Sequence, residues 1–108
     1  MADTLVQAVT NAATDDDALT RDIAQRAIES YEADQRRGDA LDALGEAYRA
    51  WKGAKGIVER VPHNSPQYDE MMLATRREFG VLQAAKRDVR NAKQRMVTAI
   101  RRHRKAVR

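Results

Sequence analysis

The chain has 108 residues, 33% of them charged, a formal net charge of +4 and no cysteine. This length predicts one small domain over 1–108, and the lack of cysteine excludes disulfides and thiolate metal sites. No apolar stretch approaches the roughly 20 residues of a membrane-spanning helix. Residues 1–17, with four aspartates and no basic side chain, do not resemble a secretory signal. We therefore expect a cytoplasmic protein, or a component of a particle assembled inside a cell.

Charge is unevenly distributed along the chain. Residues 1–75 contain 8 Lys and Arg against 14 Asp and Glu, a net charge of −6, whereas residues 76–108 contain 12 against 2, a net charge of +10. Such a split either closes within the molecule, acid against base, or presents a cationic end to an anionic partner. Both alternatives are compatible with the sequence.

Apolar residues recur at helical spacing through the acidic part of the chain. A weak pattern predicts a short helix or arm over 1–14. Three consecutive aspartates then suit the first turn of a helix over 15–37, because the helix macrodipole favours anions there. The run RRGD around Gly38 combines late-turn cations, a glycine stop and a new aspartate cap. It predicts a break or a sharp kink before a helix over 39–61.

Two apolar lines run along this 39–61 helix. One alternates three- and four-residue steps, as a coiled-coil seam does, and the other places an alanine at every seventh residue beside it. We assign the first line to the core and the alanines to its flank. The large members of this expected seam are Leu41, Leu44, Tyr48 and Trp51.

A proline-bounded loop over 62–66 precedes the most regular part of the sequence. Ser65 suits an N-cap and Pro66 suits the first helical position, so a helix is expected to begin there. Apolar residues then keep a 4-3 spacing, which predicts one uninterrupted helix over about 67–108. Its expected seam residues are Phe79, Leu82, Val89, Met96 and Ile100, with alanines 85, 92 and 99 flanking them.

Lys86 and Lys93 interrupt this second seam. Polar residues at seam positions can set the register or the oligomeric state of a coiled coil. Alternatively, the lysine stems cover apolar surface while their ammonium groups reach water.

These elements predict an all-α fold, namely an antiparallel helical hairpin or three-helix arrangement with a long C-terminal helix. The last helix would return along 39–61 and then along 15–37. A core made of thin helix seams gains stability by pairing with a second copy. We therefore expect a homo-oligomer or a subunit of a larger protein complex.

Basic residues of the C-terminal helix form a stripe displaced by one residue from the expected seam. Its members are Arg76, Arg87, Arg90, Arg101, Arg104 and Arg108. Such a stripe can contact several phosphates of a nucleic acid or another anionic partner. No interleaved exposed aromatic and no glycine-rich element accompanies it for reading bases. The alternative is a solvated flank, or ion pairs with the acidic helices.

The triplet Trp51-Lys52-Gly53 resembles the signature of the WXG100 family of small secreted helical hairpins. In that family the motif forms the turn, whereas here helical spacing continues to Val58 and turn signals begin at Pro62. The segment RRHRKAVR also differs from the family's Tyr-x-x-x-acid secretion pattern. We therefore interpret Trp51 as a core residue.

A broader likeness covers about residues 18–100. An acidic helix is followed by DALDALGEAYRAWKGAKGIVERV, a short proline loop before YDEM, and a long helix containing NAKQRMVTAI. This layout resembles the YlbF/YmcA group of small helical regulators. Proteins of that group act as non-enzymatic partners in multi-protein complexes, and the resemblance assigns no site residue here.

The sequence contains no catalytic pattern. His63 and His103 are separated by about 40 positions and have no metalloprotease-type spacing. We expect no enzyme activity, catalytic residue, cofactor, metal or small-molecule substrate, and no membrane partner. The predicted function is that of a non-enzymatic assembly or adaptor subunit of scaffold type. The alternative is a nucleic-acid-contacting small subunit of a ribonucleoprotein or DNA complex, and a third possibility is a phage or particle structural protein.

Overall fold

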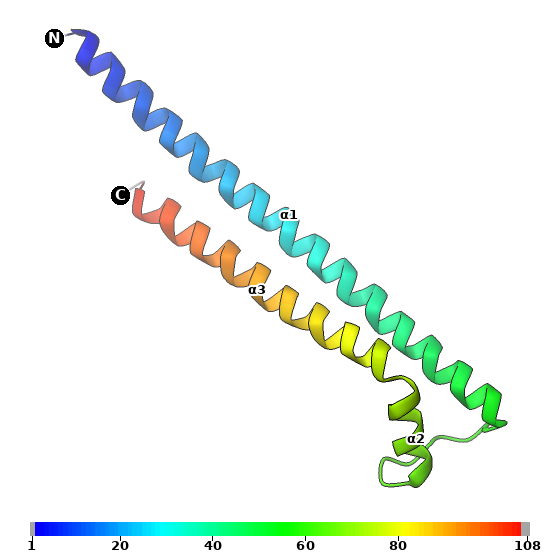
Figure 1. Ribbon diagram of the computed structural model, residues 1–108. Coiled ribbons are helices and arrows are strands. Elements are labelled where there is room, and N and C mark those ends of the chain that lie inside the picture. Colours follow the sequence, from blue (N-terminus) through cyan, green and yellow to red (C-terminus); the bar gives the residue numbers. More distant parts are fainter. Residues whose placement is uncertain (1, 107–108) are drawn as a thin grey trace. The chain divides into compact units, whose positions relative to one another are not determined.

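The computed structural model describes the backbone of residues 2–106 and the side chains of residues 16–106. The described backbone forms helices α1 (Ala2–Lys55), α2 (Pro66–Ala74) and α3 (Arg76–Ala106), which are labelled in Figure 1. No strand occurs within the described backbone. The all-α prediction with a long C-terminal helix is therefore confirmed.

Helix α1 runs without a break from Ala2 to Lys55, so the predicted break or kink at Gly38 is wrong. The separate helices expected over 1–14, 15–37 and 39–61 are wrong for the same reason. Gly38 costs a helix only about 1 kcal/mol relative to alanine. On either side of it, Ala33 and Ala40 are buried against the rest of the protein, and this packing offsets the propensity cost.

Helix α1 ends at Lys55 rather than at the expected Val61, because Gly56 takes the left-handed conformation with φ +69°. The Ile57 amide donates to the Lys52 carbonyl at 2.9 Å, and the Gly56 amide donates to the Gly53 carbonyl at 3.2 Å. These two bonds form a Schellman motif, which satisfies helix carbonyls that would otherwise lack partners. The motif directs the chain into the loop over 56–65.

Ser65 caps α2 as predicted, since its hydroxyl accepts a hydrogen bond of 3.2 Å from the Tyr68 amide, and Pro66 takes the first helical position. The uninterrupted helix over 67–108, however, is wrong. Thr75 interrupts it with backbone angles of φ −107° and ψ 15°. The Thr75 hydroxyl donates to the Met71 carbonyl at 2.7 Å, a local bond that competes with regular helix geometry.

The chain divides into two compact units. Unit 1 comprises Met1–Glu32 and Arg90–Arg108, and unit 2 comprises Ala33–Val89. Each unit contains a segment of α1 and a segment of α3. The expectation of a single domain over 1–108 stays a prediction.

Within each unit the α1 and α3 segments are antiparallel. In unit 1, Glu29 contacts Arg95, whereas the earlier residue Asp16 contacts the later residue His103. In unit 2, Ala40 and Leu44 of α1 share a cluster with Leu82 and Ala85 of α3. The antiparallel pairing expected from the sequence is therefore present in each unit.

The buried line of α3 combines the alanine line with part of the expected seam. Leu82 and Ala85 are buried in unit 2, and Ala92 and Ala99 are buried in unit 1. Half-buried Val89 and Met96 lie between the alanines and complete the three- and four-residue spacing of a coiled-coil seam. Lys86 and Lys93 lie outside this line and are exposed, so no lysine interrupts the packed face.

The expected seam residues therefore differ in burial. Leu44 and Leu82 are buried, and Tyr48, Trp51, Val89 and Met96 are half-buried. Leu41, Phe79 and Ile100 are exposed, so their assignment to the intramolecular core is wrong. The physical reason is helix geometry, because one residue corresponds to about 100° and thus places Leu41 and Ile100 more than a quarter turn from the buried Ala40 and Ala99. Their role in association with another chain stays a prediction.

Candidate functional site

The arginine stripe of α3 is exposed wherever the structure describes it. Its described members are Arg76 and Arg87 in unit 2, and Arg90, Arg101 and Arg104 in unit 1. Arg108 lies outside the described residues. Among side chains 16–106, none of these five arginines forms an ion pair with a carboxylate.

In each unit the stripe lies on the side of α3 that faces away from the buried line, and not beside it as the sequence indicated. Successive residues of an α-helix advance by about 100°. Arg101 lies two residues after Ala99 in unit 1, and Arg87 lies two residues after Ala85 in unit 2, so each arginine is about half a turn from the buried alanine. The stripe is therefore a solvent-facing surface in both units.

Ion pairing between the acidic and basic parts of the chain uses other residues. In unit 1, Arg95 Nε lies 3.9 Å from Glu29 Oε2, and His103 Nε2 lies 3.2 Å from Asp16 Oδ1. Hydrogen bonds from Arg26 and Gln25 hold the pKa of Glu29 below its ordinary value. Among side chains 16–106, Arg95 of α3 therefore pairs with an acidic residue of α1 and His103 contacts Asp16, while the described stripe arginines have no carboxylate partner.

A second surface feature is a set of large apolar side chains that remain exposed. In unit 1, Tyr31 is 67% exposed and the neighbouring Ile28 is also exposed. Arg26 and Asp22, which lie on the opposite side of α1, line a hollow of about 200 Å³ with residues of α3. Ile28 and Tyr31 thus form an apolar surface on α1 that the described side chains of unit 1 do not cover. The exposed apolar residues of unit 2 are Leu41, Val58, Leu73, Phe79 and Val81.

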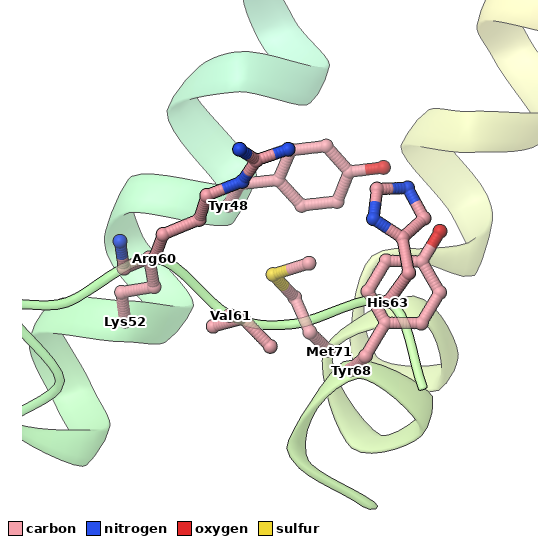
Figure 2. Close-up of a pocket in the computed structure, with 7 residues that line it drawn as sticks. All are labelled: Tyr48, Lys52, Arg60, Val61, His63, Tyr68 and Met71. Atoms are coloured by element: carbon pink, nitrogen blue, oxygen red, sulfur yellow. The ribbon is translucent and has the colours of Figure 1, made fainter. Parts of the chain in front are cut away.

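A third feature is a cavity of about 430 Å³ within unit 2, which sequence reasoning missed (Figure 2). Three elements contribute to its wall. Helix α1 supplies Tyr48 and Lys52, the loop over 56–65 supplies Arg60, Val61 and His63, and α2 supplies Tyr68 and Met71. Sequence periodicity could not reveal it, because the loop residues have no helical spacing and Tyr48 was interpreted only as a seam residue.

Aromatic residues around this cavity have defined contacts. The rings of His63 and Tyr68 stack with centroids 4.8 Å apart and planes inclined by 27°. The Tyr48 hydroxyl donates to Met72 Sδ at 3.6 Å. Burial raises the pKa of Tyr48 above its ordinary value, and the negative charge that Tyr68 would carry when ionised acts in the same direction. Tyr48 therefore contributes a neutral ring and hydroxyl to the cavity at neutral pH.

No protein-family model, curated protein or solved structure matches the chain. The likeness to the YlbF/YmcA group accordingly stays a prediction. Among the described residues, no group of three or more histidine, aspartate or glutamate side chains is arranged to hold a metal ion. No helix within residues 2–106 combines the length and hydropathy that a membrane crossing requires.

Proposed function

We propose that this chain is a non-enzymatic association subunit, an assembly or adaptor protein of scaffold type that acts by binding other protein chains. The observation that carries the proposal is the apolar surface of Ile28 and Tyr31 in unit 1. Both side chains are exposed on the side of α1 opposite Arg26. Burying a large apolar side chain fully against a partner chain contributes about 1.5–3 kcal/mol to the free energy of association.

The composition of the core supports the same proposal. Among side chains 16–106, five of the nine buried apolar residues are alanines, and no large side chain is less than 2% exposed. Alanine removes little apolar surface from water, so the helix packing of unit 1, where Ala92 and Ala99 are the buried apolar residues among the described side chains, provides a small hydrophobic stabilisation. A chain with this core gains stability when a partner covers its exposed isoleucine, leucine and tyrosine side chains.

Sedimentation velocity over about a hundredfold range of protein concentration tests self-association, since mass action shifts an oligomer toward monomer on dilution. The expected result is a mass above the 12.2 kDa of one chain, which falls on dilution. The double variant Ile28→Gln and Tyr31→Gln should dissociate at higher concentration, whereas Gln25→Ala and Gln35→Ala on the same helix should not.

A photocrosslinking side chain at position 31 then separates a homo-oligomer from a mixed complex in the cell that makes the protein. A crosslink to a second copy, or to one recurring protein, supports the proposal. A single-chain mass at all concentrations, together with no crosslinked product at position 31, contradicts it.

The second candidate function is contact with a phosphate polymer through the arginine stripe. The observation that favours it is the exposure of Arg76, Arg87, Arg90, Arg101 and Arg104 without carboxylate partners among the described side chains. Cations that contact phosphates release condensed counterions. The logarithm of the binding constant therefore falls linearly with the logarithm of the salt concentration, with a slope of about 0.9 per contacted phosphate on duplex DNA.

This candidate predicts binding to unrelated DNA or RNA that weakens steeply with salt. Replacing Arg87, Arg90, Arg101 and Arg104 by Gln should lower the logarithmic salt slope by about three to four. The matched control replaces four exposed cations of α1, namely Arg21, Arg36, Arg49 and Lys55, with the same change in net charge. No retention on either polymer at low salt, or equal losses in both variants, would exclude a role for the stripe.

A further inference from the structure

We propose that the cavity of unit 2 binds a small organic anion with an aromatic body, which places its ring among Tyr48, Tyr68 and His63 and its carboxylate or phosphate near Lys52 and Arg60. The site is independent of the proposed association through Ile28 and Tyr31, because those residues belong to unit 1.

The volume of the cavity and its apolar lining suit the aromatic ring of a ligand. Its volume of about 430 Å³ falls within the roughly 300–1,000 Å³ of typical small-ligand sites. Val61 and Met71, each 8% exposed, supply apolar surface at its base. A methionine thioether makes favourable contacts with aromatic rings, so Met71 suits a flat apolar ligand.

The aromatic wall is already assembled in the absence of a ligand. Stacking of His63 on Tyr68 holds two rings in place, because aromatic pairs stabilise each other beyond the effect of their burial. Tyr48 is fixed by the hydrogen bond of its hydroxyl to Met72 Sδ. A ligand ring therefore meets faces and edges that need no rearrangement.

The charges of the cavity favour an anion. Lys52 and Arg60 are among the seven lining residues, and no aspartate or glutamate is, although the segment 33–89 contains nine carboxylate side chains. Neither Lys52 nor Arg60 forms an ion pair within side chains 16–106. Tyr48 is neutral at physiological pH, since burial raises its pKa further above the ordinary value of 10.0, so the Tyr48 hydroxyl does not oppose an anion.

The loop that carries Arg60, Val61 and His63 is fixed at both ends. The Schellman motif around Gly56 sets its departure from α1. At its far end the Ser65 hydroxyl donates to the Pro62 carbonyl at 2.7 Å, and the Ser65 amide donates to the same carbonyl at 3.2 Å. Preorganisation of this kind reduces the entropy lost on binding.

Titration of the ¹⁵N-labelled full chain with 2-naphthoate, followed by ¹H–¹⁵N correlation spectra, tests the proposal. The two comparison ligands have the same ring, namely neutral 2-naphthalenemethanol and cationic 2-naphthylmethylammonium, and acetate provides the charge without the ring. We expect saturable amide shifts confined to 48–72 for naphthoate, with affinity about tenfold above the neutral and cationic ligands, as one charge-assisted hydrogen bond provides. Acetate should produce no saturable shift there.

Variants with matched controls locate the two parts of the site. Lys52→Gln with Arg60→Gln should reduce the preference for naphthoate over naphthalenemethanol to near unity, while Arg49→Gln with Lys55→Gln should leave it unchanged. His63→Ala should weaken the binding of 2-naphthoate and of 2-naphthalenemethanol by the same factor, and should therefore preserve the preference for the anion. Dispersed spectra of each variant verify that it folds.

Several outcomes would overturn the proposal. One is that the saturable amide shifts occur near the arginines of α3 instead of within 48–72. The others are an equal affinity for the three naphthyl ligands, and an equal loss of the preference for naphthoate in the test and control variants. Each leaves the proposed association untouched, since that proposal is read from sedimentation and crosslinking at positions 28 and 31.

Discussion

The Thr75 hydroxyl donates a 2.7 Å hydrogen bond to the Met71 carbonyl, four residues earlier, at the point where α2 ends and α3 begins. Thr75 is 2% exposed, so this hydroxyl is satisfied within the protein rather than by water. The same carbonyl also accepts from the Thr75 amide at 3.0 Å. Two donors on one carbonyl hold the chain in a turn that is not a regular helical one.

Replacing Thr75 by Val keeps the shape of the side chain and removes the hydroxyl. We expect the free energy of unfolding to fall by about 1 kcal/mol, because one buried hydrogen bond is lost while the carbonyl keeps its backbone donor. Urea unfolding followed by circular dichroism measures the change. Thr98→Val is the control, since Thr98 makes the same bond to the Gln94 carbonyl at 2.9 Å inside the continuous helix α3. Equal effects of the two substitutions would show that the bond at Thr75 has no special role.

Replacing Gly56 or Gly53 by alanine should change the free energy of unfolding in opposite directions. Gly56 has φ +69° and open space around it, so Gly56→Ala should destabilise the protein by about 1–2 kcal/mol through backbone strain alone. Gly53 is helical and equally open, so Gly53→Ala should stabilise by up to about 1 kcal/mol. Thermal unfolding of the two variants measures both. A gain in stability for Gly56→Ala would be incompatible with the Schellman end of α1.

The alanine line predicts a strong dependence on side-chain size. Ala92 is 1% exposed, and Ala92→Leu should destabilise unit 1 by about 1–3 kcal/mol through overpacking. Ala27→Leu, at an exposed position of α1 in the same unit, should change the free energy of unfolding by less than about 0.5 kcal/mol. Chemical denaturation distinguishes them. If Leu at position 92 were tolerated as well as Leu at 27, the packed face of α3 would lie elsewhere.

Glu29 should make the protein sensitive to acid. Hydrogen bonds from Arg26 and Gln25 lower its pKa from the ordinary value of 4.5. A folded-state pKa below the unfolded one contributes stability above pH 4.5, and this contribution is lost as the pH falls through the lowered pKa. Glu29→Gln should therefore reduce stability at neutral pH and flatten its decline below pH 4.5 in urea titrations. Glu32→Gln makes the same charge change nearby, and a matching effect there would contradict a specific role for Glu29.

Tyr48 should make the protein sensitive to alkali. Burial raises its pKa above the ordinary value of 10.0, so the stability associated with its neutral form is present below pH 10.0 and is lost as the pH rises through the raised pKa. Tyr48→Phe removes the bond to Met72 and should cost about 1 kcal/mol at neutral pH. This deficit should shrink above pH 10.0 in thermal unfolding. The exposed Tyr31→Phe is the control, and a deficit that stays constant for Tyr48→Phe would contradict the prediction.

Composition and spacing were sufficient to predict an all-helical chain, the Ser65 cap and the long C-terminal helix. They failed where weak local preferences compete with packing. Gly38 and Gly56 carry the same intrinsic helix penalty, yet the buried alanines on either side of Gly38 keep it helical while Gly56 ends α1. Local sequence alone does not contain that difference.

Side-chain size is a poor guide to the packed face of the C-terminal helix. Two lines with helical spacing run along this helix, and side-chain size favours the line 79–100 over the alanine line. The line 79–100 also contains Lys86 and Lys93, whose charges are costly to bury, whereas the alanine line contains no charge. Absence of charge was therefore the better signal. The cavity of unit 2 could not be predicted in the same way, because it requires the positions of α1, α2 and the loop in three dimensions.

The buried alanines of α3 also determine how easily unit 1 opens. A methyl side chain has no rotamers, so bringing Ala92 or Ala99 against a neighbouring helix freezes no χ angle. Separation in turn exposes only a small apolar area to water. The two helix segments within unit 1 can therefore part and rejoin at low free-energy cost, and amide hydrogen exchange there should proceed through such partial openings rather than through complete unfolding.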